Sequence, residues 1–208
     1  TNLTKKVQNT IFQHNLFSRG AKIILAVSGG PDSVCMLDIF TKIRRKYNLQ
    51  LIIVHVNYAL RGRDSEKDGK LVRKLAKKYN IPLFVSRPKI KNRANLENQL
   101  RDIRYAFFEK IRLENNFDLI SVAHNLNDQV ETFLMRVIRG AGLQGLSAMK
   151  HKNGNVIRPL LEIKRDEIEN YLQKNKLAFR IDKTNLKSKF LRNKIRNKLI
   201  PELKKNYN

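Results

Sequence analysis

The sequence predicts an α/β fold: an open, mostly parallel sheet covered by helices on both faces, followed by a small basic helical C-terminal extension. Three observations predict it. Short apolar runs alternate with longer segments of helical period, a glycine-rich turn follows the first apolar run, and residues 176–208 are strongly basic. In such sheets the connections are right-handed, and ligands bind beyond the carboxyl ends of the strands.

The expected elements follow from apolar period and punctuation. Continuous apolar runs predict buried strands at 22–28, 51–57, 82–86 and 118–123. Apolar residues at helical spacing predict helices at 32–47, 64–79, 95–115 and 127–138. After a glycine-rich stretch at 140–145 we expect the apolar segment 156–161, a helix at 164–175 and a basic helix at 190–199. We therefore divide the chain into a core domain, residues 1–150, and a basic extension, residues 151–208.

The composition excludes several classes of protein. The 208 residues are 41% hydrophobic and 29% charged, which excludes collagen-like, disulfide-scaffold and wholly disordered chains. The longest apolar runs are much shorter than a bilayer span, so we expect no membrane partner. The single cysteine, Cys35, excludes an internal disulfide and a four-cysteine zinc site, and it is compatible with the cytoplasmic location that we expect.

The charge points to a polyanionic partner. The chain has 43 Lys and Arg against 18 Asp and Glu, a net charge of +25. Nucleic acid is the commonest partner of such a chain, because neutralising its phosphates releases condensed counterions. Residues 176–208 carry eleven basic residues against two acids, Asp182 and Glu202, so the charge is clustered. A merely solvated surface that reflects biased codon usage is the alternative.

A phosphate-binding loop is predicted where the first strand ends and a helix begins. Glycines let backbone amides approach an anion, and the helix N-terminus adds positive potential. No lysine follows the glycines, so the loop is not of the GxxxxGK[ST] type. An empty tight turn capped by Asp32 or Ser33 is the alternative. The loop consists of Ser28, Gly29, Gly30, Pro31, Asp32 and Ser33.

With this loop the sequence resembles the PP-loop pyrophosphatase superfamily, whose members cleave ATP between the α and β phosphates and adenylate a substrate oxygen. A series of further motifs, from about residue 20 to residue 200, resembles the tRNA(Ile)-lysidine synthetase family within it. The motifs are His55-Val-Asn-Tyr-Ala-Leu-Arg61, Glu97-Asn-x-x-Arg101-x-x-Arg104-Tyr105, His124-x-x-Asn-Asp128-Gln-x-Glu131-Thr, Arg139-Gly-Ala-Gly142, Arg158-Pro-Leu-Leu161, Asp182-x-Thr-Asn185 and Arg192-Asn-x-Ile-Arg196. The resemblance implies an adenine nucleotide alpha hydrolase-like fold.

The resemblance also implies an activity and its participants. It implies an ATP-dependent ligase that adenylates the wobble cytidine of a minor isoleucine tRNA and attaches free L-lysine to form lysidine. ATP and Mg²⁺ are the implied cofactors, the anticodon loop of isoleucine tRNA is the implied RNA partner, and a homodimer is one assembly that we consider.

The site residues are assigned from the same resemblance. The implied catalytic residues are Asp32, Arg104, Asp128, Glu131 and, in support, His124; the metal would bind Asp32 and Asp128. The nucleotide would bind the phosphate loop together with His55, Asn57, Arg139, Arg192 and Arg196. The sequence departs from the family in two places: Asn127 replaces the first of two consecutive aspartates, and Tyr58 stands where histidine is more frequent.

Helical spacing gives these motifs a physical meaning of their own. Glu97, Arg101 and Arg104 are four and three residues apart and share one helix face, which can line a cleft or hold a Glu97–Arg101 ion pair. His124, Asp128 and Glu131 have the same spacing at the end of a strand. Asp128 could instead merely favour the helix N-terminus. For His55 and Asn57 the alternative is a structural polar pair at the end of a strand. For Arg192 and Arg196 it is a solvated basic helix face.

Three other functions stay open at this point. A PP-loop tRNA enzyme that inserts sulfur commonly uses cysteine pairs, whereas this chain has one cysteine. An ATP-dependent amide synthetase for small molecules would not need the charge. A noncatalytic RNA-binding protein on the same fold would release no pyrophosphate.

Overall fold

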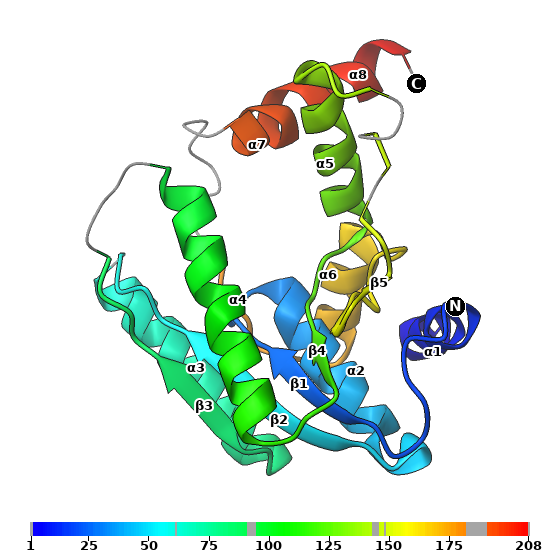
Figure 1. The fold of residues 1–208 in the computed structure, drawn as a ribbon. Helices are drawn as coiled ribbons and strands as arrows, with labels where there is room; N and C mark the ends of the chain where they lie inside the picture. Colours follow the sequence, from blue (N-terminus) through cyan, green and yellow to red (C-terminus); the bar gives the residue numbers. More distant parts are fainter. Residues whose placement is uncertain are drawn as a thin grey trace.

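The computed structural model describes residues 2–60, 62–90, 95–142, 146–147, 149–181 and 191–207, and it confirms the predicted fold class (Figure 1). The sheet has the strand order β3-β2-β1-β4-β6-β5, and only β5 is antiparallel to its neighbour. The chain moves outward from β1 to β3 and then crosses to the other side of β1. A crevice therefore opens at the carboxyl ends of β1 and β4. The strands are β1 Lys22–Ala26, β2 Gln50–Val56, β3 Leu83–Ser86, β4 Leu119–Ser121, β5 Lys152–Asn153 and β6 Val156–Ile157.

The helices largely follow the predicted ranges. Helices α2 and α3 end at Asn48 and Asn80, whose φ angles of 51° and 50° are left-handed, a conformation that asparagine tolerates at a helix end. The helices are α1 Leu3–Gln13, α2 Pro31–Tyr47, α3 Arg63–Tyr79, α4 Leu96–Glu114, α5 Leu126–Ile138, α6 Arg165–Lys174, α7 Leu191–Lys194, the π-helix η2 Ile195–Leu199, and α8 Ile200–Tyr207. None of the helices in the described part of the chain has the length and hydropathy of a membrane span.

Both faces of the sheet are covered, as predicted. Alternate residues of β1 point to opposite faces, so Ile23 and Leu25 join one core cluster and Ile24 joins the other. The first cluster takes its helical residues from α1, α2, α3 and α6, and the second takes Phe108 and Ile111 from α4. Helix α5 extends beyond the sheet, and α7 and η2 pack against it (Figure 1).

Two features differ from the sequence prediction. Helix α1 was not predicted, although Leu3, Val7 and Ile11 repeat every four residues and are buried. The expected basic helix at 190–199 is present, but it passes through a π-helical turn and continues as α8. The division of the chain at residue 150 stays a prediction; beyond it, β6 pairs with β4 and α6 packs on α2.

Candidate active site

The loop of residues 28–33 is held in shape by its own hydroxyl groups. Ser33 Oγ accepts hydrogen bonds from the amides of Ser28 and Gly29, both at 3.2 Å, and donates to the Gly30 carbonyl at 3.0 Å. The Gly30 amide donates to Ser28 Oγ at 3.3 Å. Gly29 has a φ of +93°, which strains any residue with a side chain. The structure thus brings all six predicted loop residues together.

Helix α2 begins in this loop. Pro31 occupies the first helical position, and no side chain in the described part of the chain caps the helix. The amides of the first turn have no partner within a helix and carry the positive end of its dipole. This geometry favours an anion-binding loop over the alternative of a turn capped by Asp32 or Ser33.

Asp32 and Asp128 lie on either side of a buried asparagine. Asn125, which is 2% exposed, donates from Nδ2 to Asp32 Oδ1 at 3.0 Å. Its Oδ1 accepts from the Asp128 amide at 3.1 Å, and its own amide donates to Asp128 Oδ2 at 3.0 Å. Burial and then the charge of Asp128 raise the pKa of Asp32. Carboxylate oxygens are the ligands that magnesium prefers, so the two residues have the donor chemistry of the predicted metal site.

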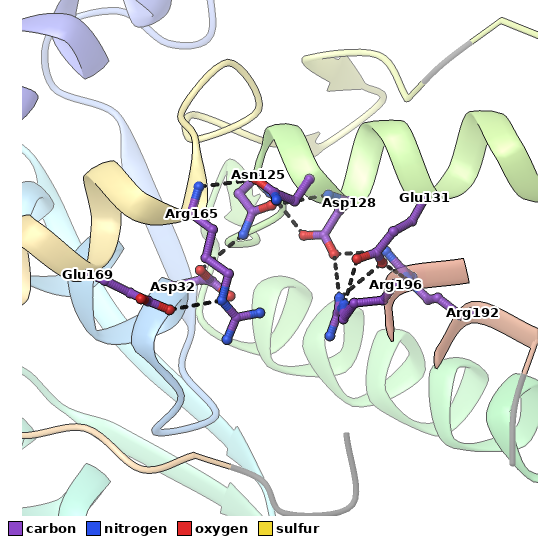
Figure 2. A network of polar contacts seen from close by, with 9 residues as sticks. Asp32, Asn125, Asp128, Glu131, Arg165, Glu169, Arg192 and Arg196 are labelled. Atoms are coloured by element: carbon purple, nitrogen blue, oxygen red, sulfur yellow. Dashed lines mark hydrogen bonds and ion pairs between the residues drawn. The ribbon is translucent and has the colours of Figure 1, made fainter. Parts of the chain in front are cut away.

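Glu131 is an almost fully buried carboxylate held between two arginines (Figure 2). It is 1% exposed and accepts from Arg192 Nε at 2.7 Å and from Arg196 Nε at 2.5 Å. A second nitrogen of Arg192 donates to Asp128 Oδ1 at 2.8 Å. Asp128 and Glu131, both on α5, therefore form an acidic pair whose two charges are balanced by Arg192 from α7 and Arg196 from η2.

His124 lies between β4 and α5 in a strongly positive environment. Its Nδ1 accepts a hydrogen bond from Arg158 Nε at 3.2 Å. Burial, followed by the charges of Arg158, Arg192, Arg104 and Arg101, lowers the pKa of His124 to about 3. The ring is therefore neutral at pH 7, and the arginines around it favour a bound anion.

The charged row on α4, which consists of Glu97, Arg101 and Arg104, faces the region around His124. Arg101 and Arg104 are exposed, and both lower the pKa of His124 through their charge. Within the described chain Glu97 and Arg101 form no ion pair, which removes the alternative that they merely bind each other. Arg104 is thus an exposed guanidinium whose charge acts on His124, and its catalytic role stays a prediction.

A comparison with protein families matches residues 1–203 of the chain to the PP-loop domain. The chain belongs to the PP-loop domain family. Membership of this family implies that the chain uses ATP. The loop of residues 28–33 lies within the matched range and is called the PP-loop below.

Two curated relatives of this PP-loop domain carry the same name. A tRNA(Ile)-lysidine synthase from Clostridium tetani is 45% identical over 208 residues, which cover 97% of this chain and 44% of the relative. A tRNA(Ile)-lysidine synthase from Caldanaerobacter subterraneus subsp. tengcongensis is 44% identical over 204 residues, which cover 96% and 44%. The chain thus spans less than half the length of these relatives.

Two solved structures share the fold. The U34-tRNA thiolase NcsA from Methanococcus maripaludis matches with a TM-score of 0.76 and 21% identity, over 98% of this chain and 72% of the thiolase. An NH3-dependent NAD synthetase from Campylobacter jejuni matches with a TM-score of 0.54 and 13% identity, over 98% and 86%. At these identities the likeness concerns the fold alone.

The polar residues at the end of β2 and just after it have different hydrogen-bond partners. The Asn57 side chain binds backbone, donating to the Ser65 carbonyl at 3.1 Å and accepting from the Ala59 amide at 2.9 Å. His55 binds the Val27 carbonyl through Nδ1 at 2.8 Å, and its buried Nε2 has no partner within the described chain. Tyr58 donates to the Leu100 carbonyl at 2.5 Å and so ties β2 to α4.

Other predicted residues lie apart from the PP-loop or outside the described chain. Arg139 is exposed at the far end of α5, about 16 Å of helix from Asp128. Asn127 turns its Oδ1 to the Arg165 amide, at 3.1 Å, so the atom that could replace a carboxylate oxygen binds the start of α6. The motif Asp182-x-Thr-Asn185 and Arg61 lie outside the described residues.

Three residues at the site were not predicted. Asn125 links the two aspartates, and its signal was an asparagine three residues before an acid at a helix start, the pattern of a capping box. Arg165 lies beside Asp32 (Figure 2) and lowers the pKa of that carboxyl against the larger effect of burial. Arg180 donates its amide to the Gly29 carbonyl at 3.0 Å and binds Asp68 at 2.6 Å. No local pattern marked these two arginines.

Proposed function

We propose that the chain is the ATP-dependent catalytic part of a tRNA-modifying ligase that forms lysidine. ATP transfers its adenylyl group to the C2 oxygen of the wobble cytidine of a minor isoleucine tRNA, and pyrophosphate leaves. The ε-amine of free lysine then attacks C2, and AMP leaves with that oxygen. The names of the relatives support this reaction, and the chain's own geometry supports each participant.

One observation carries the proposal: an anion-binding loop stands beside an acidic pair, Asp128 and Glu131, that binds cations. Asn125 links Asp32, in the PP-loop, to Asp128, in the acidic pair. The pair already binds two guanidinium groups through charge-assisted hydrogen bonds, and the same carboxylates would bind the ammonium group of lysine when an arginine moves away. A nucleotide and an amine would thus meet at one end of the sheet.

The residues then have distinct roles. Asp32 and Asp128 would hold magnesium, which neutralises phosphate charge when it is bound. Glu131 and Asp128 would bind the lysine amine, and a carboxylate would take a proton from it before it attacks. Arg104 would stabilise the negative charge that develops during adenylation. His124, neutral among arginines, would accept a hydrogen bond and so support their positions.

The phosphate-binding residues belong to the same proposal. Arg192 and Arg196 would leave the acidic pair when lysine binds there and would turn toward the phosphates of the substrates. Arg139, exposed at the end of α5, suits the RNA backbone better than the PP-loop. The net charge of +25 suits tRNA. The cytoplasm, where tRNA, lysine and ATP occur together, is the proposed location, and a homodimer is a proposed assembly that light scattering would test.

A sulfur-inserting function is the main alternative, and one residue argues against it. The only cysteine, Cys35, is fully buried in α2, and burial raises the pKa of its thiol. A thiol that is neutral and inaccessible cannot serve as the nucleophile in sulfur transfer.

Release of labelled pyrophosphate from ATP with magnesium tests the proposal. Four mixtures are compared: no addition, lysine alone, isoleucine tRNA alone, and both. We expect release to require the tRNA and lysine to become attached to it. Asp128→Ala should abolish release, whereas Asp102→Asn, an exposed acid on α4, should not affect it. Binding of tRNA without pyrophosphate release in any mixture would favour a noncatalytic RNA-binding protein, and release without RNA would favour an amide synthetase.

A further inference from the structure

Three potential metal ligands converge from distant parts of the chain, outside the candidate active site. His14 caps the C-terminus of α1, His151 directly precedes β5, and Glu162 lies between β6 and α6. His14 Nε2 lies 2.9 Å and His151 Nε2 lies 3.1 Å from the same oxygen, Glu162 Oε1. In the described part of the chain this is the one group of three such residues whose ligand atoms all lie within 4.8 Å of one another.

The arrangement is unusual for two simple ion pairs. The imidazole rings stack with centroids 3.5 Å apart and an interplanar angle of 8°. Stacked in this way, both rings present Nε2 to the same carboxylate oxygen, Glu162 Oε1. His151 Nε2 is buried, and its contact with Glu162 lacks the geometry of a hydrogen bond. A buried ring nitrogen thus points at a carboxylate without satisfying its hydrogen-bonding capacity.

A hydrogen bond to its other oxygen orients the Glu162 carboxylate. Thr10, which is 1% exposed, donates from Oγ1 to Glu162 Oε2 at 3.3 Å. Outer partners of this kind commonly orient the ligands of a metal. A tetrahedral ion with ligands about 2.0–2.2 Å away requires ligand atoms roughly 3.3–3.6 Å apart. The two nitrogens lie 2.9 and 3.1 Å from Glu162 Oε1, a few tenths of an ångström short of that spacing.

We propose that His14, His151 and Glu162 form a binding site for a transition-metal ion of the zinc class, with water as a further ligand. Two imidazoles and one carboxylate are a donor set that suits Zn²⁺ and disfavours Mg²⁺. The ion would join the end of α1 to the edge of the sheet near β5. It would also lie next to Arg158, whose amide donates to the His151 carbonyl at 2.8 Å and whose side chain reaches His124.

Metal binding to the tag-free chain tests this site. Cobalt(II) serves as a spectroscopic probe, and we expect a visible d–d absorption that saturates at one ion per chain and that Zn²⁺ displaces. His14→Ala and His151→Ala should each weaken binding by more than about tenfold, since losing only an outer partner costs 10–100-fold. His14 is partly exposed at a helix end, so its replacement leaves the fold intact, which circular dichroism verifies.

A thermal readout distinguishes this site from adventitious binding. Zn²⁺ at a hundred times its dissociation constant should raise the unfolding midpoint by about 5–10 °C in the unaltered chain. It should have no such effect on His14→Ala, and it should retain its effect on Glu114→Gln, an exposed carboxylate in another region. Binding that the histidine substitutions leave unchanged, or the absence of a stoichiometric cobalt spectrum, would overturn the proposal.

Discussion

Acidification should destabilise the protein through His124. The ring is buried beside arginines, and its pKa is lowered from 6.5 to about 3 in the folded protein. The unfolded chain therefore takes up a proton at this residue first, so the contribution of His124 disfavours the folded state once the pH falls below about 6.5. Each pH unit below that value costs about 1.36 kcal/mol until the folded pKa is reached. Between about pH 7.5 and pH 5 the loss is roughly 2 kcal/mol.

Urea unfolding of the unaltered chain and of His124→Gln, at both pH values and constant ionic strength, isolates this contribution. Glutamine keeps an acceptor for Arg158 but does not titrate, so the variant should lose about 2 kcal/mol less on acidification. Other titrating groups, including the buried His55, are present in both proteins and cancel in the difference. Equal losses in the two proteins, to within about 0.5 kcal/mol, would refute the assignment of a buried neutral ring.

Three further substitutions test the site and its support. Glu131→Gln should lower the free energy of unfolding in urea by about 3–5 kcal/mol, because two arginines lose the buried charge that they bind. Glu114→Gln is the control, and an equally small effect of both substitutions would contradict this. Asp38→Asn should cost about 2–3 kcal/mol in the same assay, because Asp38 accepts from two tyrosines and pairs with a lysine; no loss would contradict the network. Gly29→Ala should weaken ATP binding about tenfold, measured by equilibrium dialysis, whereas Gly20→Ala, strained alike but elsewhere, should not.

Features whose parts are neighbours in the chain could be predicted from the sequence. The alternation of apolar runs and helical segments determined the parallel sheet, because period and length are local properties. The PP-loop was predictable for the same reason: the hydroxyl of Ser33 binds amides four and five residues away. Helix α1 carried an equally local signal in Leu3, Val7 and Ile11, but short helices depend on burial for their stability, and burial is not visible in one segment.

Which charged side chains contact each other depends on tertiary packing. Arg192 and Arg196 come to Glu131 across 61 and 65 residues, and His14 comes to Glu162 across 148. Spacing along one helix could place Asp128 beside Glu131, but it could not show that arginines from another helix neutralise both. The physical reason is that a charge interacts with whatever the fold brings within a few ångströms, regardless of its distance along the chain. Residues that are close in sequence determine the helices and strands, whereas tertiary packing determines which side chains interact.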